Sequence, residues 1–233
     1  MQLPESLIGD AARFVACHEV GHSLGLRHNM RASNAYPTDS LRSAEFTARV
    51  GGTSTSIMDY ARFNYVAQPG DGVTVTSPHI GVYDMMAIEW GYRWFPTEEE
   101  GKKPLVDFLK KHNSPLYRYS EAQPARAAVD PRSLSEDLGD NAMKSARYGI
   151  ANLKRIMPEL VNWTTTGQPG QTYEEAAKLY SGVIFQWGLY LYHVMANVGG
   201  IYLENTTVGD GEQTFTYVEK DRQKEAVQFL LEE

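Results

Sequence analysis

Residues 18–28 read HEVGHSLGLRH and bring three imidazoles and one carboxylate close together in the chain. His18 and His22 are four residues apart, about one helical turn or 6 Å, so both rings leave the same face of a helix and can share one metal ion. Gly25 can adopt a positive φ and end that helix, because it has no Cβ atom. The chain can then turn back and bring His28 to the same ion. Three histidines at this spacing are typical of a catalytic zinc site.

Glu19 follows the first of these histidines and is not needed as a ligand. Zinc held by three side chains keeps its fourth tetrahedral position for water and lowers the pKa of that water to about 7. Glu19 is then placed to hold the water and to accept its proton. The motif predicts metal-assisted hydrolysis, with Zn²⁺ as the cofactor and Glu19 as the general base.

Residues 56–60, which read SIMDY, place a methionine downstream of the histidines. Zinc sites with this histidine pattern have a supporting turn that carries a methionine. The thioether of Met58 could be taken for a ligand. We expect it instead to pack beneath the imidazoles as an adaptable apolar side chain.

The pattern HExxHxxGxxH followed by SIMDY resembles the metzincin zinc metallopeptidases. The longer stretches HEVGHSLGLRHN and SIMDYARFNYVAQPGD are similar to a bacterial Met-zincin family found in large secreted proteins. The resemblance implies a zinc-dependent endopeptidase that acts on proteins or peptides, with Glu19 as its general base and Met58 as the floor of its site. The zinc ligands that it implies are His18, His22 and His28.

Tyr60 matches the position at which astacin-like and serralysin-like metzincins place a tyrosine that reaches the zinc or the developing oxyanion. The alternative is a tyrosine packed in a loop. Asn29 departs from the residue that many metzincins carry after the third histidine, so it assigns no subfamily. Residues 82–92 are similar to the helix that follows the Met-turn in serralysins and matrixins, with Asp84 near its start. The resemblance covers residues 10–94.

Metzincin catalytic domains place a twisted mixed sheet before the zinc-binding helix, and extended substrates pair with its edge strand. Only seventeen residues precede His18, and they predict a short lead-in and a helix with Asp10 as its N-cap. The last residues, VQFLLEE, end inside a helical pattern without a cap. We therefore expect a fragment of a longer parent chain, whose upstream residues are its partner. The isolated fragment is expected to be weakly active or inactive.

The resemblance divides the chain into residues 1–94, with the active-site helix, the third-ligand loop and the Met-turn, and residues 95–233, a mostly helical extension packed on them. Residues 201–208 and 213–218, joined by GDGE, predict a β-hairpin in the extension. The predicted fold class is mainly α: part of a metzincin catalytic domain without its upstream sheet, followed by a helical region with one small β-hairpin.

Capping-box pairs, a proline and apolar periodicity predict the helices of the extension. They cover residues 97–112, opened by Thr97 and Glu100; 140–157, ended by Pro158; 173–198, opened by Thr172 and Glu175; and a last segment that starts near Lys220. The apolar run within residues 173–198 is interrupted by Gln186, His193 and Asn197. It predicts a buried core helix and no membrane span.

Composition limits the partners and the compartment. A net charge of −7 and a pI near 5.4 argue against nucleic acid, which requires a basic face. Cys17 is the only cysteine, so no internal disulfide can form. The first residues lack the pattern of a signal peptide. We expect localisation to follow the parent protein, which the resemblance places outside the cytoplasm.

Other readings of these residues stay open. A zinc hydrolase of a non-peptide amide would share the ligands and the base. Residues 95–233 could instead be chiefly a docking or structural module of a large secreted protein, which a broad exposed apolar patch would favour. The remaining histidines are expected to lie outside the site: His79, His112 and His193.

Overall fold

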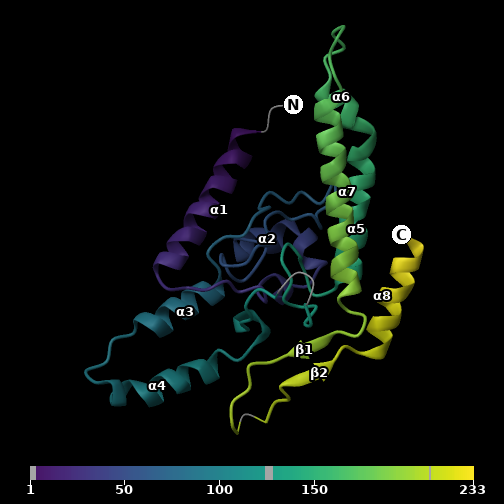
Figure 1. Cartoon of the computed structure of the whole chain (residues 1–233). Helices are drawn as coiled ribbons and strands as arrows, with labels where there is room; N and C mark the ends of the chain where they lie inside the picture. Colours follow the sequence, from purple (N-terminus) through teal and green to yellow (C-terminus); the bar gives the residue numbers. More distant parts are fainter. Residues whose placement is uncertain (1–3, 124–127, 210) are drawn as a thin grey trace.

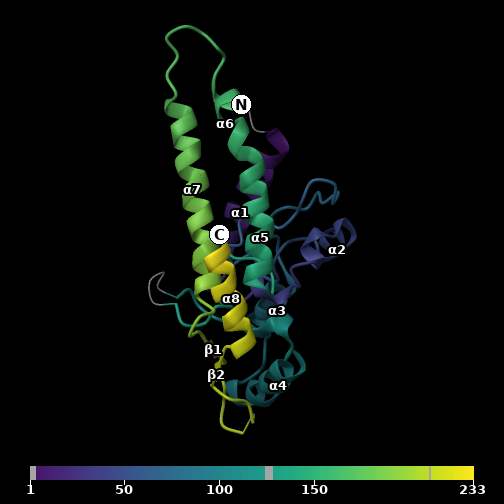
Figure 2. The ribbon, with the colours of Figure 1, turned by 90° about the vertical axis from the view of Figure 1, so that its right-hand side faces the viewer.

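The computed structural model describes residues 4–123, 128–209 and 211–233, and Figures 1 and 2 show a mostly helical chain with one two-stranded sheet. The chain first forms helices α1 (Glu5–Ser23), α2 (Ala44–Val50), α3 (Val82–Tyr92) and α4 (Glu98–Lys111). It then forms α5 (Ala142–Ile156), α6 (Leu160–Thr164), α7 (Glu174–Met195), strands β1 (Ile201–Leu203) and β2 (Phe215–Tyr217), and α8 (Lys220–Glu232). The predicted mainly α fold with one small β-hairpin is confirmed.

Helix α1 begins earlier than predicted. Its first residue is Glu5, with Pro4 as the N-cap, and Glu5 places a negative charge at the positive end of the helix dipole. Asp10, the predicted N-cap, lies inside the helix. Its carboxylate accepts hydrogen bonds from Arg13 and Ser77 instead. The prediction was wrong because a distant segment, around Ser77, supplies a partner that the local sequence does not show.

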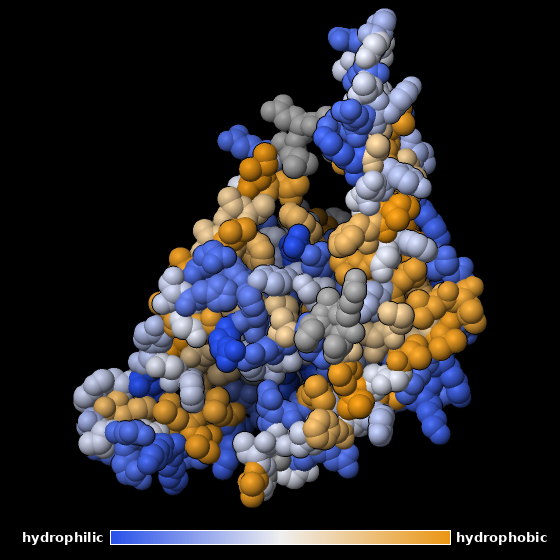
Figure 3. Space-filling view, in the orientation of Figure 1, coloured by the Kyte–Doolittle hydropathy of each residue, from blue (hydrophilic) through white to orange (hydrophobic). Residues whose placement is uncertain are grey.

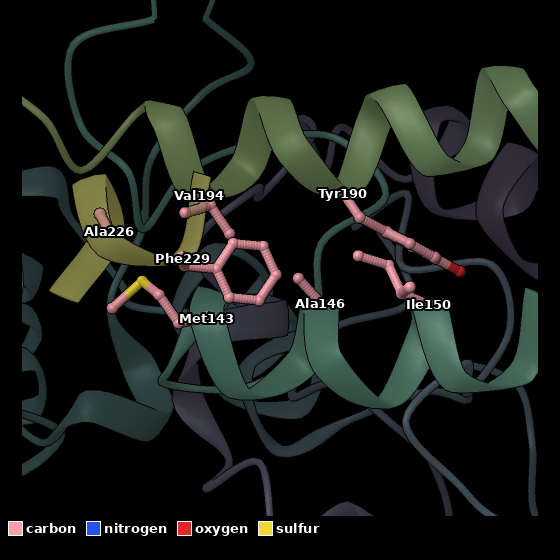
Figure 4. Close-up of a cluster of buried hydrophobic side chains, with 7 residues drawn as sticks. All are labelled: Met143, Ala146, Ile150, Tyr190, Val194, Ala226 and Phe229. Atoms are coloured by element: carbon pink, nitrogen blue, oxygen red, sulfur yellow. The ribbon is translucent and has the colours of Figure 1, made fainter. Parts of the chain in front are cut away.

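Helices α5 and α7 lie side by side as a long hairpin, and α8 packs against both (Figures 1 and 2). Asn141 caps α5, because its side-chain oxygen accepts from the N–H of Lys144. Gly149 lets the ring of Tyr190 lie against α5, since a Cβ atom there would overlap the ring. Figure 4 shows the apolar cluster that the three helices bury together: Met143, Ala146, Ile150, Tyr190, Val194, Ala226 and Phe229.

The start of α7 differs from the prediction. The helix begins at Glu174 with Tyr173 as its N-cap, and no side chain caps it. The capping box between Thr172 and Glu175 therefore does not form. Glu175 instead pairs with Lys178, one turn into the helix.

Pro158 follows the end of α5 as predicted, but the chain stays helical beyond it. A single 3₁₀ turn, Met157–Glu159, joins α5 to the short helix α6. Proline fits the first turn of a helix, because the N–H that it lacks would have no partner there. By contrast, Thr97 caps α4 as predicted and accepts from the N–H of Glu100.

The hairpin pairs Ile201 with Tyr217 and Leu203 with Phe215, so it is shorter than predicted. Asp210, in the predicted GDGE turn, lies outside the described residues. Within the described ranges, none of the helices combines the length and the apolar character needed to cross a membrane.

The loop after the third histidine contacts the second half of the chain. Arg31 forms ion pairs with Asp130 and with Glu204, which follows β1. Arg132 also pairs with Asp130. A second apolar cluster includes Leu41 and, from the loop before α5, Leu138. The two halves are therefore in contact, and their division at residue 94 into two domains stays a prediction.

Candidate metal centre

Helix α1 carries His18 and His22 and ends just before Gly25, which adopts the predicted positive φ, 85°. The chain turns there and brings His28 back to the helix. One nitrogen atom from each of the three rings lies within 4.8 Å of the others. Among the described histidine, cysteine, aspartate and glutamate residues, no other group of three or more converges in this way.

Backbone carbonyls orient two of these rings. The Nδ1 atom of His18 lies 2.8 Å from the carbonyl oxygen of Ile57, and Nδ1 of His22 lies 3.0 Å from that of Leu26. A proton on Nδ1 that bonds to a carbonyl leaves Nε2 with its lone pair, which is the form that binds a metal. The Nε2 atoms of His22 and His28 lie 3.1 Å apart.

The three rings suit a zinc ion by their chemistry. Burial lowers the pKa of His28, and the neighbouring His18 and His22 lower it further. His28 is therefore neutral at neutral pH, as a ligand must be. Neutral imidazoles are preferred ligands of Zn²⁺, and three of them leave a fourth position open.

Glu19 lies on the exposed side of α1, next to His18 in the chain. Its carboxylate is close enough to the rings for its negative charge to oppose the lowering of the His28 pKa. The carboxylate of Glu19 is therefore exposed to solvent and acts on His28 through its charge.

Met58 is fully buried beneath the active-site helix. Its sulfur occupies the space that a Cβ atom at Gly21 would need. Its carbonyl accepts a hydrogen bond from the N–H of Asn29, 3.1 Å away, next to the third histidine. Sequence reasoning missed Gly21, although it is the glycine within HEVGH.

Asp84, on α3, holds the turn that carries the methionine. One carboxylate oxygen accepts from the hydroxyl of Ser56 at 2.5 Å, and the other from the N–H groups of Ile57 at 2.7 Å and Gly81 at 2.8 Å. Burial raises the pKa of this carboxyl group, and the hydrogen bonds from Gly81, Ser56 and Ile57 oppose that shift. Because the carbonyl of Ile57 orients His18, Asp84 supports one of the three converging histidines through one residue. The sequence placed Asp84 only near the start of a helix.

Tyr60 lies over the histidines. Its hydroxyl oxygen is 2.8 Å from Nε2 of His28. Its ring stacks on that of His18, with centroids 5.3 Å apart and an interplanar angle of 22°. The hydroxyl group is therefore beside the point at which the three nitrogens converge.

Asn29 lies in the loop beyond the third histidine and is fully buried. Its amide donates to the carbonyl of Arg118 and accepts from the N–H of Ser120. These bonds hold part of the second half of the chain beside the metal centre. The residues that follow Ser120 line a pocket of about 320 Å³ together with the histidine loop: His22, Leu26, Arg27, His28, Glu121 and Ala122. This pocket opens onto two of the three histidines.

A larger apolar groove of about 820 Å³ lies on the other side of α1, between that helix and α3. Its walls include Val20, Leu24 and Met85, and Figure 3 shows apolar side chains along α1. None of the three converging histidines lines this groove.

The other histidines have different neighbours. His79 lies 3.7 Å from Asp10, His112 bonds to the carbonyl of Phe108, and His193 bonds to that of Ser135. All three lie outside the group that converges.

The sequence model of a family described as Met-zincin matches residues 1–233, which is the whole chain. No curated protein and no solved structure matches it.

Proposed function

The chain belongs to the Met-zincin family, and on that premise we propose that it is a zinc-dependent endopeptidase, which hydrolyses peptide bonds of protein substrates. One observation carries the proposal. Three histidine nitrogens converge within 4.8 Å, the hydroxyl of Tyr60 lies 2.8 Å from one of the rings, and the charge of Glu19 acts on His28.

The residues fit a zinc ion that would be held by His18, His22 and His28. Zinc bound there would lower the pKa of a water molecule and polarise the carbonyl group of the scissile bond. No other group in the described part of the chain offers a comparable set of ligands.

The remaining chemistry belongs to the side chains of the protein. Glu19 accepts the proton of the attacking water and later gives it to the leaving amine. The hydroxyl of Tyr60 turns away from His28 and donates a hydrogen bond to the oxyanion that forms at the scissile carbonyl group. Ile57 keeps the ring of His18 in one tautomer throughout.

Cleavage by the chain alone is expected to be slow. The only sheet within the described residues is the hairpin of β1 and β2, and neither strand lines the pocket beside the histidines. Substrate alignment can account for about 7–11 kcal/mol of barrier lowering. The upstream partner and a location outside the cytoplasm stay predictions.

The test measures zinc content and cleavage together. Purified chain with one equivalent of zinc is incubated in excess over an unstructured protein such as casein, and products are identified by mass spectrometry. Wild-type protein is expected to give cleavage that a chelator abolishes, whereas Glu19→Ala keeps its zinc and cleaves nothing. Equal cleavage by Glu19→Ala would contradict the proposal. Hydrolysis of a non-peptide amide without any cleavage of casein would contradict it too.

A further inference from the structure

Two buried carboxylates, one of them in the turn that carries Tyr60, bind the same residue, Ser33. Asp59 lies between Met58 and Tyr60 and is 0% exposed, and Asp137 lies in the loop before α5 and is 6% exposed. They come from opposite halves of the chain. The pair is therefore a direct link between the candidate metal centre and the helical part.

Ser33 joins the two carboxylates. Its N–H donates to Oδ2 of Asp59 at 2.6 Å, and its hydroxyl donates to Oδ1 of Asp137 at 3.0 Å. The carboxylate of Asp59 also accepts a hydrogen bond from the backbone N–H of Tyr60. Asp59 thus fixes the backbone of Tyr60 through this hydrogen bond.

One oxygen of this arrangement has no partner. Oδ1 of Asp59 is buried and makes no hydrogen bond within the described residues. A bare carboxylate oxygen in that position is costly, because burial without a hydrogen bond forfeits its hydration. A proton on this carboxyl group would remove the buried charge and most of that cost.

The raised pKa values of both carboxyl groups also favour a bound proton. Burial raises the pKa of Asp59 to about 7. Burial also raises the pKa of Asp137 well above its usual range, and the charge of Asp59 raises it further. Neither carboxylate forms an ion pair with a lysine or arginine among the described residues. Two buried carboxylates at close range cannot both be ionised at low cost.

The cationic groups that line the same small pocket as Asp137 are engaged elsewhere. Arg222 donates to the carbonyl of Asp140 and to the hydroxyl of Tyr202. Asp84 on α3 and Asp130 add negative charge, and Asp130 already pairs with Arg31 and Arg132. His193 on α7 shares a small pocket with Asp137, and burial lowers its pKa to about 4, so it is neutral. Tyr65 is also neutral, because burial and the charge of Asp137 raise its pKa.

We propose that Asp59 and Asp137 share one proton at neutral pH, and that this protonated pair is a positioning element that holds the backbone of Tyr60. A proton on one of the two acids removes the repulsion between their charges, while Ser33 stays bound to both. Asp137 acts on Tyr60 only through Ser33 and Asp59. The role of the pair in the fold is independent of the proposed function, whereas its effect on Tyr60 rests on that function.

The pair makes stability depend on pH with a definite sign. The folded protein keeps a proton that the unfolded chain loses near pH 4. The stabilisation is therefore complete below that pH and is lost as the pH rises, until the folded pair also gives up its proton. Over that range the ratio of folded to unfolded protein falls by up to about tenfold per pH unit.

The test compares urea unfolding of metal-free wild-type protein and Asp137→Asn between pH 7 and 9. The asparagine amide can donate the hydrogen bond of the protonated acid but cannot titrate. The ratio of folded to unfolded wild-type protein is expected to fall by up to about tenfold per pH unit. For Asp137→Asn this ratio should fall much less. The control is Asp221→Asn, a 97% exposed acid on α8, which should keep the wild-type slope. Equal slopes for wild type and Asp137→Asn would overturn the shared proton.

Two measurements on wild-type protein apply even if the variant does not fold. Infrared spectroscopy should show the carbonyl band of a protonated carboxyl group at pH 7, and its absence would overturn the proposal. Calcium or magnesium should not shift the unfolding midpoint at pH 9. A shift would show that the pair holds a cation and no proton.

A separate kinetic measurement tests whether the pair positions Tyr60. With cleavage measured from pH 7 to 9, kcat of the wild type should fall as the pair loses its proton while KM stays constant, and kcat of Asp137→Asn should fall less. Identical pH profiles would refute positioning, whereas cleavage that survives in Glu19→Ala or in the presence of a chelator would refute the proposed function. The unfolding result stands apart from both outcomes.

Discussion

The turn that carries Met58 is held by hydrogen bonds between buried polar groups, whereas the hairpin of α5 and α7 is held by interlocked apolar side chains. In the turn, Asp84 accepts from two backbone N–H groups, at Ile57 and Gly81, and from one hydroxyl. Around the hairpin, Val194 of α7 and Phe229 of α8 lie in one buried apolar cluster (Figure 4). Directional bonds fix the atoms around the histidines to a fraction of an ångström, while apolar packing supplies stability without fixing any one atom.

This comparison predicts that the two regions fail in different ways. Changes in the polar region should alter metal binding more than stability, and changes in the apolar region should do the reverse. Four substitutions test this expectation, and they are ordered by the size of the expected effect.

Removal of a metal ligand should have the largest effect. His22→Ala leaves two imidazoles, which are too few for a stable zinc site, so the chain should lose stoichiometric zinc. Because His22 is exposed, the free energy of unfolding of the metal-free protein should hardly change. Zinc analysis after dialysis checks the first statement and urea unfolding checks the second. Retention of one zinc per chain would remove His22 from the ligand set.

Phe229→Ala should destabilise the hairpin without touching zinc. The ring is fully buried between α5, α7 and α8, and its loss leaves a cavity that typically costs about 3–5 kcal/mol. Urea unfolding of the metal-free protein measures this cost. The matched control is Leu231→Ala on the same helix, whose side chain is 84% exposed and whose loss should cost little. Loss of zinc in folded Phe229→Ala would show that the two regions are not separable.

Asp84→Ala should weaken zinc binding with a moderate loss of stability. The N–H groups of Ile57 and Gly81 would lose their acceptor, and each such buried group costs about 1–3 kcal/mol. The carbonyl that orients His18 would then be free to move, and loss of such a support typically reduces metal affinity by about 10–100-fold. Competition with a zinc indicator measures this. Glu89→Gln, on an exposed face of the same helix, serves as the control, and an equal affinity of both variants would refute the supporting role.

Met58→Leu should have the smallest effect. Leucine conserves most of the volume beneath α1, and such swaps usually cost under about 1.5 kcal/mol. Zinc stoichiometry should stay at one, because the sulfur packs against Gly21 and is not a ligand. A loss of zinc in this variant would instead make the thioether part of the metal site.

The same comparison explains how far the sequence could predict the molecule. Short-range chemistry was sufficient for the histidine spacing, the turn at Gly25 and the Thr97 cap, whereas the helix over Val82–Tyr92 was expected from the family resemblance. Each of the first three features depends on residues within one or two helical turns. Both failed caps, at Asp10 and at Thr172, were also judged from local patterns, and other partners of the side chains prevailed.

The features that were missed depend on residues far apart in the chain. The bonds from Asp84 to Ser56, from Asn29 to Ser120 and from Ser33 to Asp137 each join distant segments. No local pattern distinguishes these polar residues from exposed ones. An unpartnered buried oxygen, such as that of Asp59, can be recognised only after the surrounding segments are in place.

The most direct test of the metal centre is X-ray absorption spectroscopy of the zinc-loaded chain. The account predicts one zinc ion with three imidazole nitrogens at about 2.0–2.1 Å, completed by light-atom ligands and without sulfur. A sulfur ligand near about 2.3 Å would implicate Cys17 or Met58. That result, or fewer than three imidazoles, would contradict the assignment of His18, His22 and His28.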